Sequence, residues 1–159
     1  KIVSVVGKEK GGMLEEFRRG IEREEKREAL LPESQQFLSG AKYTAQIMEQ
    51  APVSVFVLNS LGKGLFSSMN EEERIFEVCN IQSVSAAIQN MLLAAEHKGI
   101  GSLWIYDIFF AYEELCQWLG TEGELLAAVS FGYPNEAPKP RPRKELDKVV
   151  VWKDGGLKR

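Results

Sequence analysis

The chain has a single histidine, His97, and only two cysteines, Cys79 and Cys116. One imidazole is too few for a zinc site built on histidines, and it gives weak support to a Ser-His-Asp triad. The cysteines lie far apart and form no Cys-x-x-Cys pair, so we interpret both as buried, unreactive thiols in a reducing compartment. We therefore predict no metal site and no Ser-His-Asp triad.

Positive charge and long apolar runs are also scarce. Twenty Lys and Arg residues face 23 Asp and Glu, which gives a formal net charge of −3 and a pI near 5.4. Proteins that coat nucleic acid or an anionic membrane need an excess of clustered cations, so we expect neither partner. The apolar runs fall short of the roughly 20 residues that cross a bilayer, and the first residues lack the layout of a signal peptide, which predicts a cytoplasmic protein.

The 159 residues, 44% of them apolar, suffice for one globular domain with its own core. Short β-branched or apolar runs alternate with stretches of helical periodicity, a pattern typical of α/β and α+β folds. Strands are expected at residues 2–6, 53–58, 102–106, 125–131 and 148–152, and helices at 13–29, 83–98 and 112–119. Because the chain opens directly on strand-like residues without a Met, we expect that an upstream segment is missing.

Two regions between these elements are less regular. Pro32 and Gly40 interrupt residues 31–50, where we expect loop and short helix, and residues 62–70 are expected to form a flexible connection. The helix at 83–98 has clearer ends: Ser83 can cap its start, and Gly99 supplies the left-handed residue that stops it. His97 is expected to serve the end of this helix.

Residues 134–159 differ in composition from the rest and are expected to form an extended arm, with four prolines between positions 134 and 142. The arm carries a cluster of cations: Lys139, Arg141, Arg143 and Lys144. The guanidinium fork matches phosphate oxygens, and an extended backbone projects Arg141 and Arg143 from the same side, which favours a phosphate site. The alternative is a set of solvated charges on a polar tail, which can pair with Glu145 and Asp147.

The turn that runs from Gly99 to Asp107 is a second candidate site. Gly99 and Gly101 let a backbone approach a flat ligand, the following strand offers peptide N–H and C=O groups, and Trp104 can cover a ring. The alternative interpretation is a plain helix-to-strand turn with a tryptophan in the core.

A family resemblance connects these two segments. Residues 89–105, QNMLLAAEHKGIGSLWI, resemble the central helix of the nitroreductase family and the turn and strand that follow it. Residues 128–134, AVSFGYP, followed by PRPRK at 140–144, resemble the closing strand and the proline-arginine arm of the same family, in its order and at its spacing. The family's Arg-rich opening helix, which contacts the phosphate and ribityl chain, has no counterpart here.

The resemblance implies an α+β fold with a central mixed sheet flanked by helices, and a homodimer of the domain-swapped type with an extended C-terminal arm. It also implies FMN in the dimer interface. Arg143 and Arg141 match the cations that bind the FMN phosphate. The residues that match the segment along the isoalloxazine ring, where a backbone N–H faces flavin N5, are Ser102, Trp104, Ile105, Tyr106 and Asp107.

The activity implied by the resemblance is an oxidoreductase that passes hydride from NAD(P)H through FMN to an electron-poor small molecule such as a nitroaromatic or a quinone. Two alternatives remain at this stage. One is a flavin-binding or flavin-free dimer that serves binding or assembly without reductase turnover. The other keeps the flavin and changes the reaction, for example to enone reduction, reductive dehalogenation or oxygen-dependent flavin cleavage.

Overall fold

The computed structural model describes residues 1–26 and 29–153, and four strands in this part of the chain form a sheet with the order β1-β2-β4-β3. The elements in chain order are β1 (Ile2–Val6), α1 (Glu9–Glu25), η1 (Pro32–Phe37), α2 (Leu38–Gln50), β2 (Val53–Asn59), α3 (Glu71–His97), β3 (Gly101–Ile105), η2 (Asp107–Ala111), α4 (Tyr112–Leu119), β4 (Glu124–Gly132) and η3 (Leu146–Lys148).

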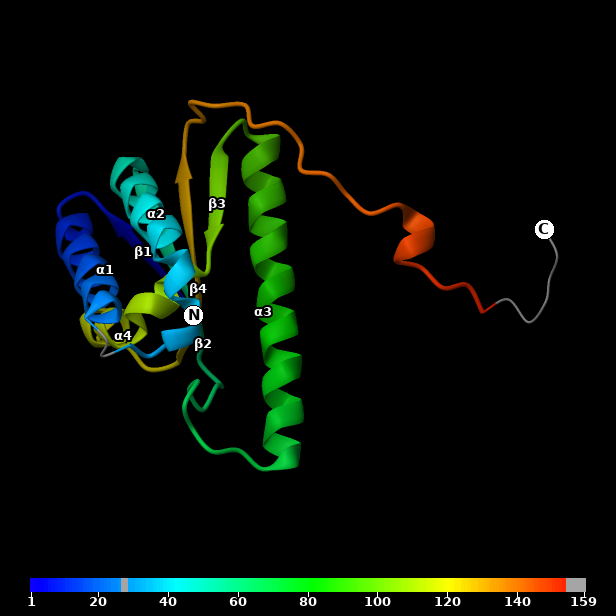
Figure 1. Ribbon diagram of the computed structural model, residues 1–159, viewed down its shortest axis with the longest axis horizontal. Coiled ribbons are helices and arrows are strands. Elements are labelled where there is room, and N and C mark those ends of the chain that lie inside the picture. Colours follow the sequence, from blue (N-terminus) through cyan, green and yellow to red (C-terminus); the bar gives the residue numbers. More distant parts are fainter. Residues whose placement is uncertain (27–28, 154–159) are drawn as a thin grey trace.

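Helices cover both faces of the sheet: α1, α2 and α4 lie on one face and α3 on the other (Figure 1). Successive side chains of β2 serve opposite faces, as the pleat of a strand requires. Phe56 belongs to the larger core with Phe17 and Leu115, whereas Val55 belongs to a smaller core beneath α3, with Ile88. A strand buried on both faces explains the nearly continuous apolar run in this stretch of sequence.

The α+β class is confirmed, but the expected mixed sheet is antiparallel at every strand pair of the described residues. Between β1 and β2 the chain makes two helices, α1 and α2, so it returns in the opposite direction. The single helix α3 joins β2 to β3, and these two strands run parallel, but β4 lies between them. The alternation of strands and helices in the sequence does not reveal this insertion.

The expected loop and short helix at 31–50 is mostly regular helix, because α2 spans 13 of these residues. Its buried residues Leu38, Ala41, Ala45 and Met48 recur every three or four positions and pack in the larger core. Gly40 lies on the exposed side and does not interrupt the helix. The helix expected at 13–29 is α1, which begins at Glu9 and ends at Glu25; positions 27 and 28 lie outside the described residues.

Helix α3 begins 12 residues earlier than expected. Asn70 caps it: its side chain accepts from the backbone N–H of Glu73, whose carboxylate accepts from the Asn70 N–H at 2.9 Å. Ser83, the expected cap, lies within the helix and donates to the Cys79 carbonyl at 2.9 Å. The first half of α3 buries little and therefore shows no apolar stripe in the sequence. The expected end is confirmed, with Gly99 at φ 68°.

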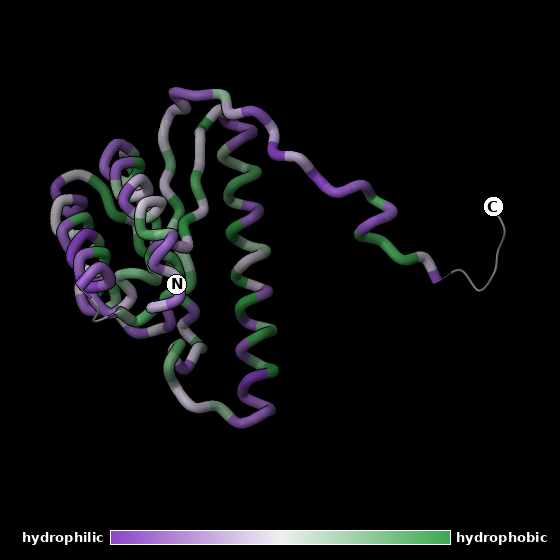
Figure 2. Tube along the Cα trace, viewed as in Figure 1, coloured by the Kyte–Doolittle hydropathy of each residue, from purple (hydrophilic) through white to green (hydrophobic). Residues whose placement is uncertain are grey.

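The strand expected at 148–152 is absent from the described residues, where η3 is followed by irregular chain. The arm passes the C-terminal end of α3 and then leads away from the sheet and helices (Figure 1). Figure 2 shows hydrophobic residues in the part of the arm farthest from the sheet. Val149, Val151 and Trp152 are 59%, 86% and 69% exposed. A strand needs a partner edge, and the arm meets none among the residues that the structure describes.

Candidate functional site

The candidate ring-binding residues lie on and directly after β3, the edge strand of the sheet. β3 pairs with β4 along one edge, so its other edge has no strand partner in the part of the chain that the structure describes. Ser102 and Tyr106 are exposed and Trp104 is half-buried. Ile105 is 2% exposed and packs in the larger core, so only its backbone can reach a ligand.

Trp104 packs in the core, as one of the two interpretations predicts, and its role in covering a ring stays a prediction. Its ring packs against the smaller core and stacks on Tyr106, with ring centroids 5.5 Å apart and planes inclined by 23°. Its indole Nε1 is buried and has no hydrogen-bond partner in the described chain. An unsatisfied buried donor costs about 1 to 3 kcal/mol, so this N–H is an available donor for an acceptor that the chain does not supply.

Packing on the other face of the sheet fixes the segment after β3. The Thr44 hydroxyl of α2 donates to Asp107 Oδ2 at the start of η2. Helix α1 also approaches η2 closely at Gly20, where a Cβ would overlap Ala111 and lie 2.9 Å from the Phe110 carbonyl oxygen. Two helices therefore hold η2, α2 at the Asp107 side chain and α1 at Phe110 and Ala111.

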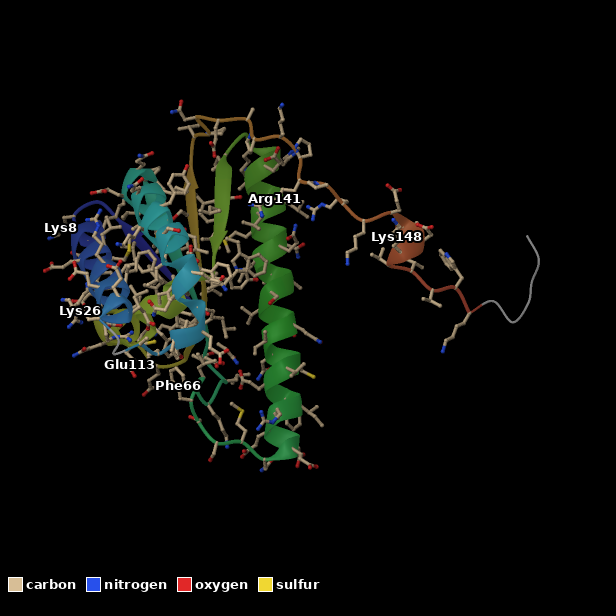
Figure 3. All side chains as sticks on the ribbon, in the orientation of Figure 1. Lys8, Lys26, Phe66, Glu113, Arg141 and Lys148 are labelled. Atoms are coloured by element: carbon tan, nitrogen blue, oxygen red, sulfur yellow. The ribbon has the colours of Figure 1, made fainter. Side chains whose placement is uncertain are left out.

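The arm begins beside the opposite end of β3. Gly101 pairs with Gly132, and a Cβ on Gly101 would lie 3.3 Å from Pro134 Cβ, at the start of the arm. Arg141 and Arg143 follow on the exposed arm; Figure 3 labels Arg141 near the end of α3. Neither forms an ion pair with any described residue, so the pairing with nearby carboxylates is not seen, but both arginines are exposed to solvent, as the alternative of solvated charges also predicts.

The open edge of β3 thus connects the two predicted segments without bringing them into contact. With a rise of about 3.3 Å per residue, the five residues of β3 span roughly 16 Å. An extended ligand with a flat ring at one end and a phosphate at the other suits such a separation. A compact ligand would reach only one of the two segments.

Helix α3 exposes large apolar side chains along its first half: Ile75, Phe76 and Val78 are 64%, 59% and 49% exposed. Cys79 beside them is also exposed and Cys116 is half-buried, so the expectation of two buried thiols is wrong for Cys79. Exposed apolar surface of this kind is typical of an interface.

Two buried ionic clusters were missed in the sequence. Arg23 of α1 donates to Glu114 Oε1 of α4 at 2.7 Å and contacts the fully buried Glu24 at 2.9 Å. Burial tends to raise the pKa of Glu114, but its hydrogen bond with Arg23 prevails and leaves this pKa lowered. The second cluster contains Glu77 and Glu124. The only indication of this cluster in the sequence is Glu124, the charged residue that begins the otherwise apolar run of β4.

Groups of three or more His, Cys, Asp or Glu side chains that could hold a metal ion do not occur among residues 1–26 and 29–153. Within the same residues, no helix is both long and apolar enough to span a membrane.

Comparison with known proteins yields one family and several similar structures. The model described as "Nitroreductase family" matches residues 2–133. A nitroreductase-like family protein from Bacillus cereus is 16% identical, with a TM-score of 0.65 over 98% of this chain and 73% of that one. An FMN-dependent nitroreductase from Mycobacterium smegmatis, solved with NADPH, is 15% identical, with a TM-score of 0.64 over 96% and 78%. A BluB-like flavoprotein from Clostridium difficile is 22% identical, with a TM-score of 0.61 over 96% and 78%.

Proposed function

Because the chain belongs to the nitroreductase family, as the sequence resemblance predicted, we propose that it is an FMN-dependent oxidoreductase that oxidises NAD(P)H and reduces an electron-poor small molecule such as a nitroaromatic or a quinone. FMN, when bound, supplies the hydride chemistry. The observation that carries the proposal is the open edge of β3, with an unpaired buried indole N–H beside it.

The residues of β3 fit a flat cofactor. Exposed Ser102 and the backbone of residues 104–107 offer hydrogen bonds along an open strand edge. Trp104 Nε1 is a buried donor without an acceptor, and Tyr106 presents an exposed ring next to it. These groups bind and orient a ring and restrict its contact with water; the backbone N–H of Tyr106 or Asp107 is the donor that we assign to flavin N5.

Arg141 and Arg143 are the residues that we assign to the FMN phosphate. Both are exposed cations without an ion pair among the described residues, so they lose no protein contact when they bind an anion. Their arm begins at the end of β3 away from Tyr106, which suits a cofactor whose phosphate and ring lie at opposite ends.

We further propose that the chain acts as a homodimer. The apolar first half of α3 and the apolar end of the arm, around Val149 and Trp152, are both exposed in a single chain. The arm leads away from the body, so a second copy can cover it (Figure 1). Burial of these two surfaces against a partner would provide the hydrophobic stabilisation that a lone chain does not obtain from them.

The decisive experiment is a titration of the purified protein with FMN, followed by an assay of NAD(P)H oxidation with a quinone acceptor. Arg143→Ala is expected to weaken FMN binding by about 1.5 to 3 kcal/mol, or roughly 10- to 150-fold, because a charge-assisted contact is lost. Lys148→Ala removes the same charge farther along the arm and should change the affinity little. Wild-type protein that binds FMN but oxidises no NAD(P)H would indicate a binding protein of this fold instead.

If Arg143→Ala binds FMN as tightly as the wild type, the phosphate assignment is wrong. If the wild type takes up no FMN at all, the proposed function fails for the chain as given.

A further inference from the structure

A pair of buried carboxyl groups joins α3 to the sheet, on the side of the molecule where β2 ends and β4 begins. Glu77 of α3 is 8% exposed and Glu124, the first residue of β4, is 4% exposed. Asn59, the last residue of β2, donates through Nδ2 to Glu77 Oε1 at 2.8 Å. Glu124 Oε2 is buried and accepts no hydrogen bond from any described residue.

Gly62 packs closely against this cluster. A Cβ on Gly62, in the loop after β2, would lie 2.8 Å from both Asn59 Nδ2 and Glu124 Oε2. The backbone N–H of Leu61 donates to Asn59 Oδ1 at 3.1 Å and so orients the amide. The Asn59 amide donates one N–H to Glu77 and none to Glu124 Oε2, so a proton held between the two carboxyl groups can supply the missing donor.

Among the described residues, no cation shifts the pKa of Glu124. Burial raises the pKa of Glu124 most, and the hydrogen bond to Glu77 and the charge of Glu77 raise it further. The pKa of Glu124 is therefore about 7. From α4, the buried Tyr112 faces the same cluster, and burial raises its pKa to about 12, so it stays neutral. The nearby Lys63 of the loop pairs with Glu73 on α3.

Glu77 is also the one buried residue in the first half of α3. The other buried residues of this helix, Ile88 and Ala95, lie in its second half. The apolar side chains around Glu77, such as Phe76 and Val78, point to solvent. Attachment of the first half of α3 to the sheet therefore depends on the contact of Glu77 with Asn59 and Glu124, with the exposed pair of Lys63 and Glu73 as an additional link.

We propose that Glu124 keeps a proton in the folded chain and donates it to Glu77, and that this hydrogen bond holds the first half of α3 against the sheet and releases it when the proton is lost. Two ionised carboxylates in contact repel each other, whereas a proton between them satisfies the otherwise unpartnered Glu124 oxygen. The result is a pH-sensitive attachment of the helix half that carries the exposed apolar surface. This inference does not depend on flavin binding.

The raised pKa of Glu124 determines how stability changes with pH. Below pH 4.5, the ordinary value for a glutamate, Glu124 is protonated in both folded and unfolded chains, and its contribution to stability is complete. Between pH 4.5 and about 7 the unfolded chain loses this proton while the folded chain keeps it, so stability falls as the pH rises. Above about pH 7 Glu124 is ionised in the folded chain as well.

The test compares wild type, Glu124→Gln and Glu122→Gln, using backbone hydrogen exchange between pH 5.5 and 8.5, corrected for the intrinsic pH dependence of exchange. Glutamine keeps the shape of the side chain and donates permanently to Glu77. In the wild type we expect protection of residues 74–82 to fall as the pH rises, while residues 88–97 stay protected. In Glu124→Gln the protection of 74–82 should not change with pH. Glu122 is exposed, so Glu122→Gln is the control for charge and should behave like the wild type.

Thermal midpoints give a second readout. Glu124→Gln should raise the midpoint at pH 8.5 by a few degrees, on the order of 2 to 8 °C, and raise it much less at pH 5. Should Glu124→Gln not fold, NMR titration of carbonyl-labelled glutamates in the wild type must still show one carboxyl group that titrates above pH 6. The proposal is overturned if every glutamate titrates below pH 6, if protection of 74–82 in the wild type ignores pH, or if both variants lose the pH dependence equally.

Discussion

Replacement of Gly20 by alanine tests how firmly the segment after β3 is held. Gly20 lies on the buried face of α1 against η2, where a Cβ would overlap Ala111 and approach the Phe110 carbonyl oxygen to 2.9 Å. Both neighbours belong to backbone or to a short side chain, so no flexible group can move aside. The helix α1 and the segment η2 must separate, and η2 begins at Asp107, within the proposed ring-binding segment.

Two opposing contributions determine how much Gly20→Ala lowers the free energy of unfolding. Overpacking of a well-packed core costs about 1 to 3 kcal/mol, and contact with backbone atoms puts this site at the upper end. Alanine recovers up to about 1 kcal/mol of helix propensity relative to glycine. The expected net loss is about 2 kcal/mol of unfolding free energy. A Cβ on Gly11, in the same helix, would meet no atom within 4 Å, so Gly11→Ala should stabilise by about 0.5 kcal/mol.

The assay is urea unfolding of wild type, Gly20→Ala and Gly11→Ala at one pH, together with an FMN titration of each. Gly20→Ala is expected to bind FMN more weakly than Gly11→Ala, because displacement of η2 moves the backbone at residues 106–107. If the two variants are equally stable, the close approach of α1 to η2 is not a constraint and the reasoning fails. If only stability differs, η2 moves without disturbing the ring-binding segment.

Two further substitutions test the helix contacts. Arg23→Met removes the cation that lies between the buried Glu24 and Glu114. Glu24 keeps its hydrogen bonds from the Leu30 and Leu31 backbone N–H groups, but Glu114 loses its ion-pair partner, so the variant should cost about 3 to 5 kcal/mol in urea unfolding at pH 7. Because Arg23 lowers the Glu114 pKa, the stability it contributes is lost as the pH falls, so the cost should shrink at pH 4; an equal loss at both pH values would contradict this. Asn70→Ala should cost about 1 kcal/mol of unfolding free energy and increase amide exchange in the first turn of α3. Ser83→Ala should leave the unfolding free energy almost unchanged. If Ser83→Ala costs more than Asn70→Ala, the assigned cap is wrong.

The sequence predicts the interior strands well because their burial produces a simple pattern. β2 is covered on both faces and is apolar almost throughout, so its position can be read without knowledge of its neighbours. Helix α2 was missed although its buried residues follow helical spacing, because Pro32 and Gly40 suggested interruptions that lie just before the helix or on its exposed side. The start of α3 was missed because a helix half that buries only Glu77 has no stripe to recognise.

The candidate site is harder to predict because it depends on strand order. Residues 102–107 were found from their composition and from a family resemblance, but their open edge exists only because β4 lies between β2 and β3. The burial of Ile105, and the stacking of Trp104 on Tyr106, likewise follow from the fold and from no local pattern. The cluster of Glu77 and Glu124 joins residues 47 positions apart, and no spacing in the sequence indicates it.

The exposed surfaces of α3 and the arm lead to a prediction about linkage between flavin binding and dimerisation. If the FMN site is complete only in the dimer, FMN must tighten the dimer by the same factor by which dimerisation tightens FMN binding. Phe76→Arg places a charge on the exposed apolar face of α3 and should weaken both dimerisation and FMN binding. Sedimentation at a series of chain concentrations, with and without FMN, measures both. A Phe76→Arg chain that sediments as a monomer and yet binds FMN with wild-type affinity would show that one chain suffices for the site.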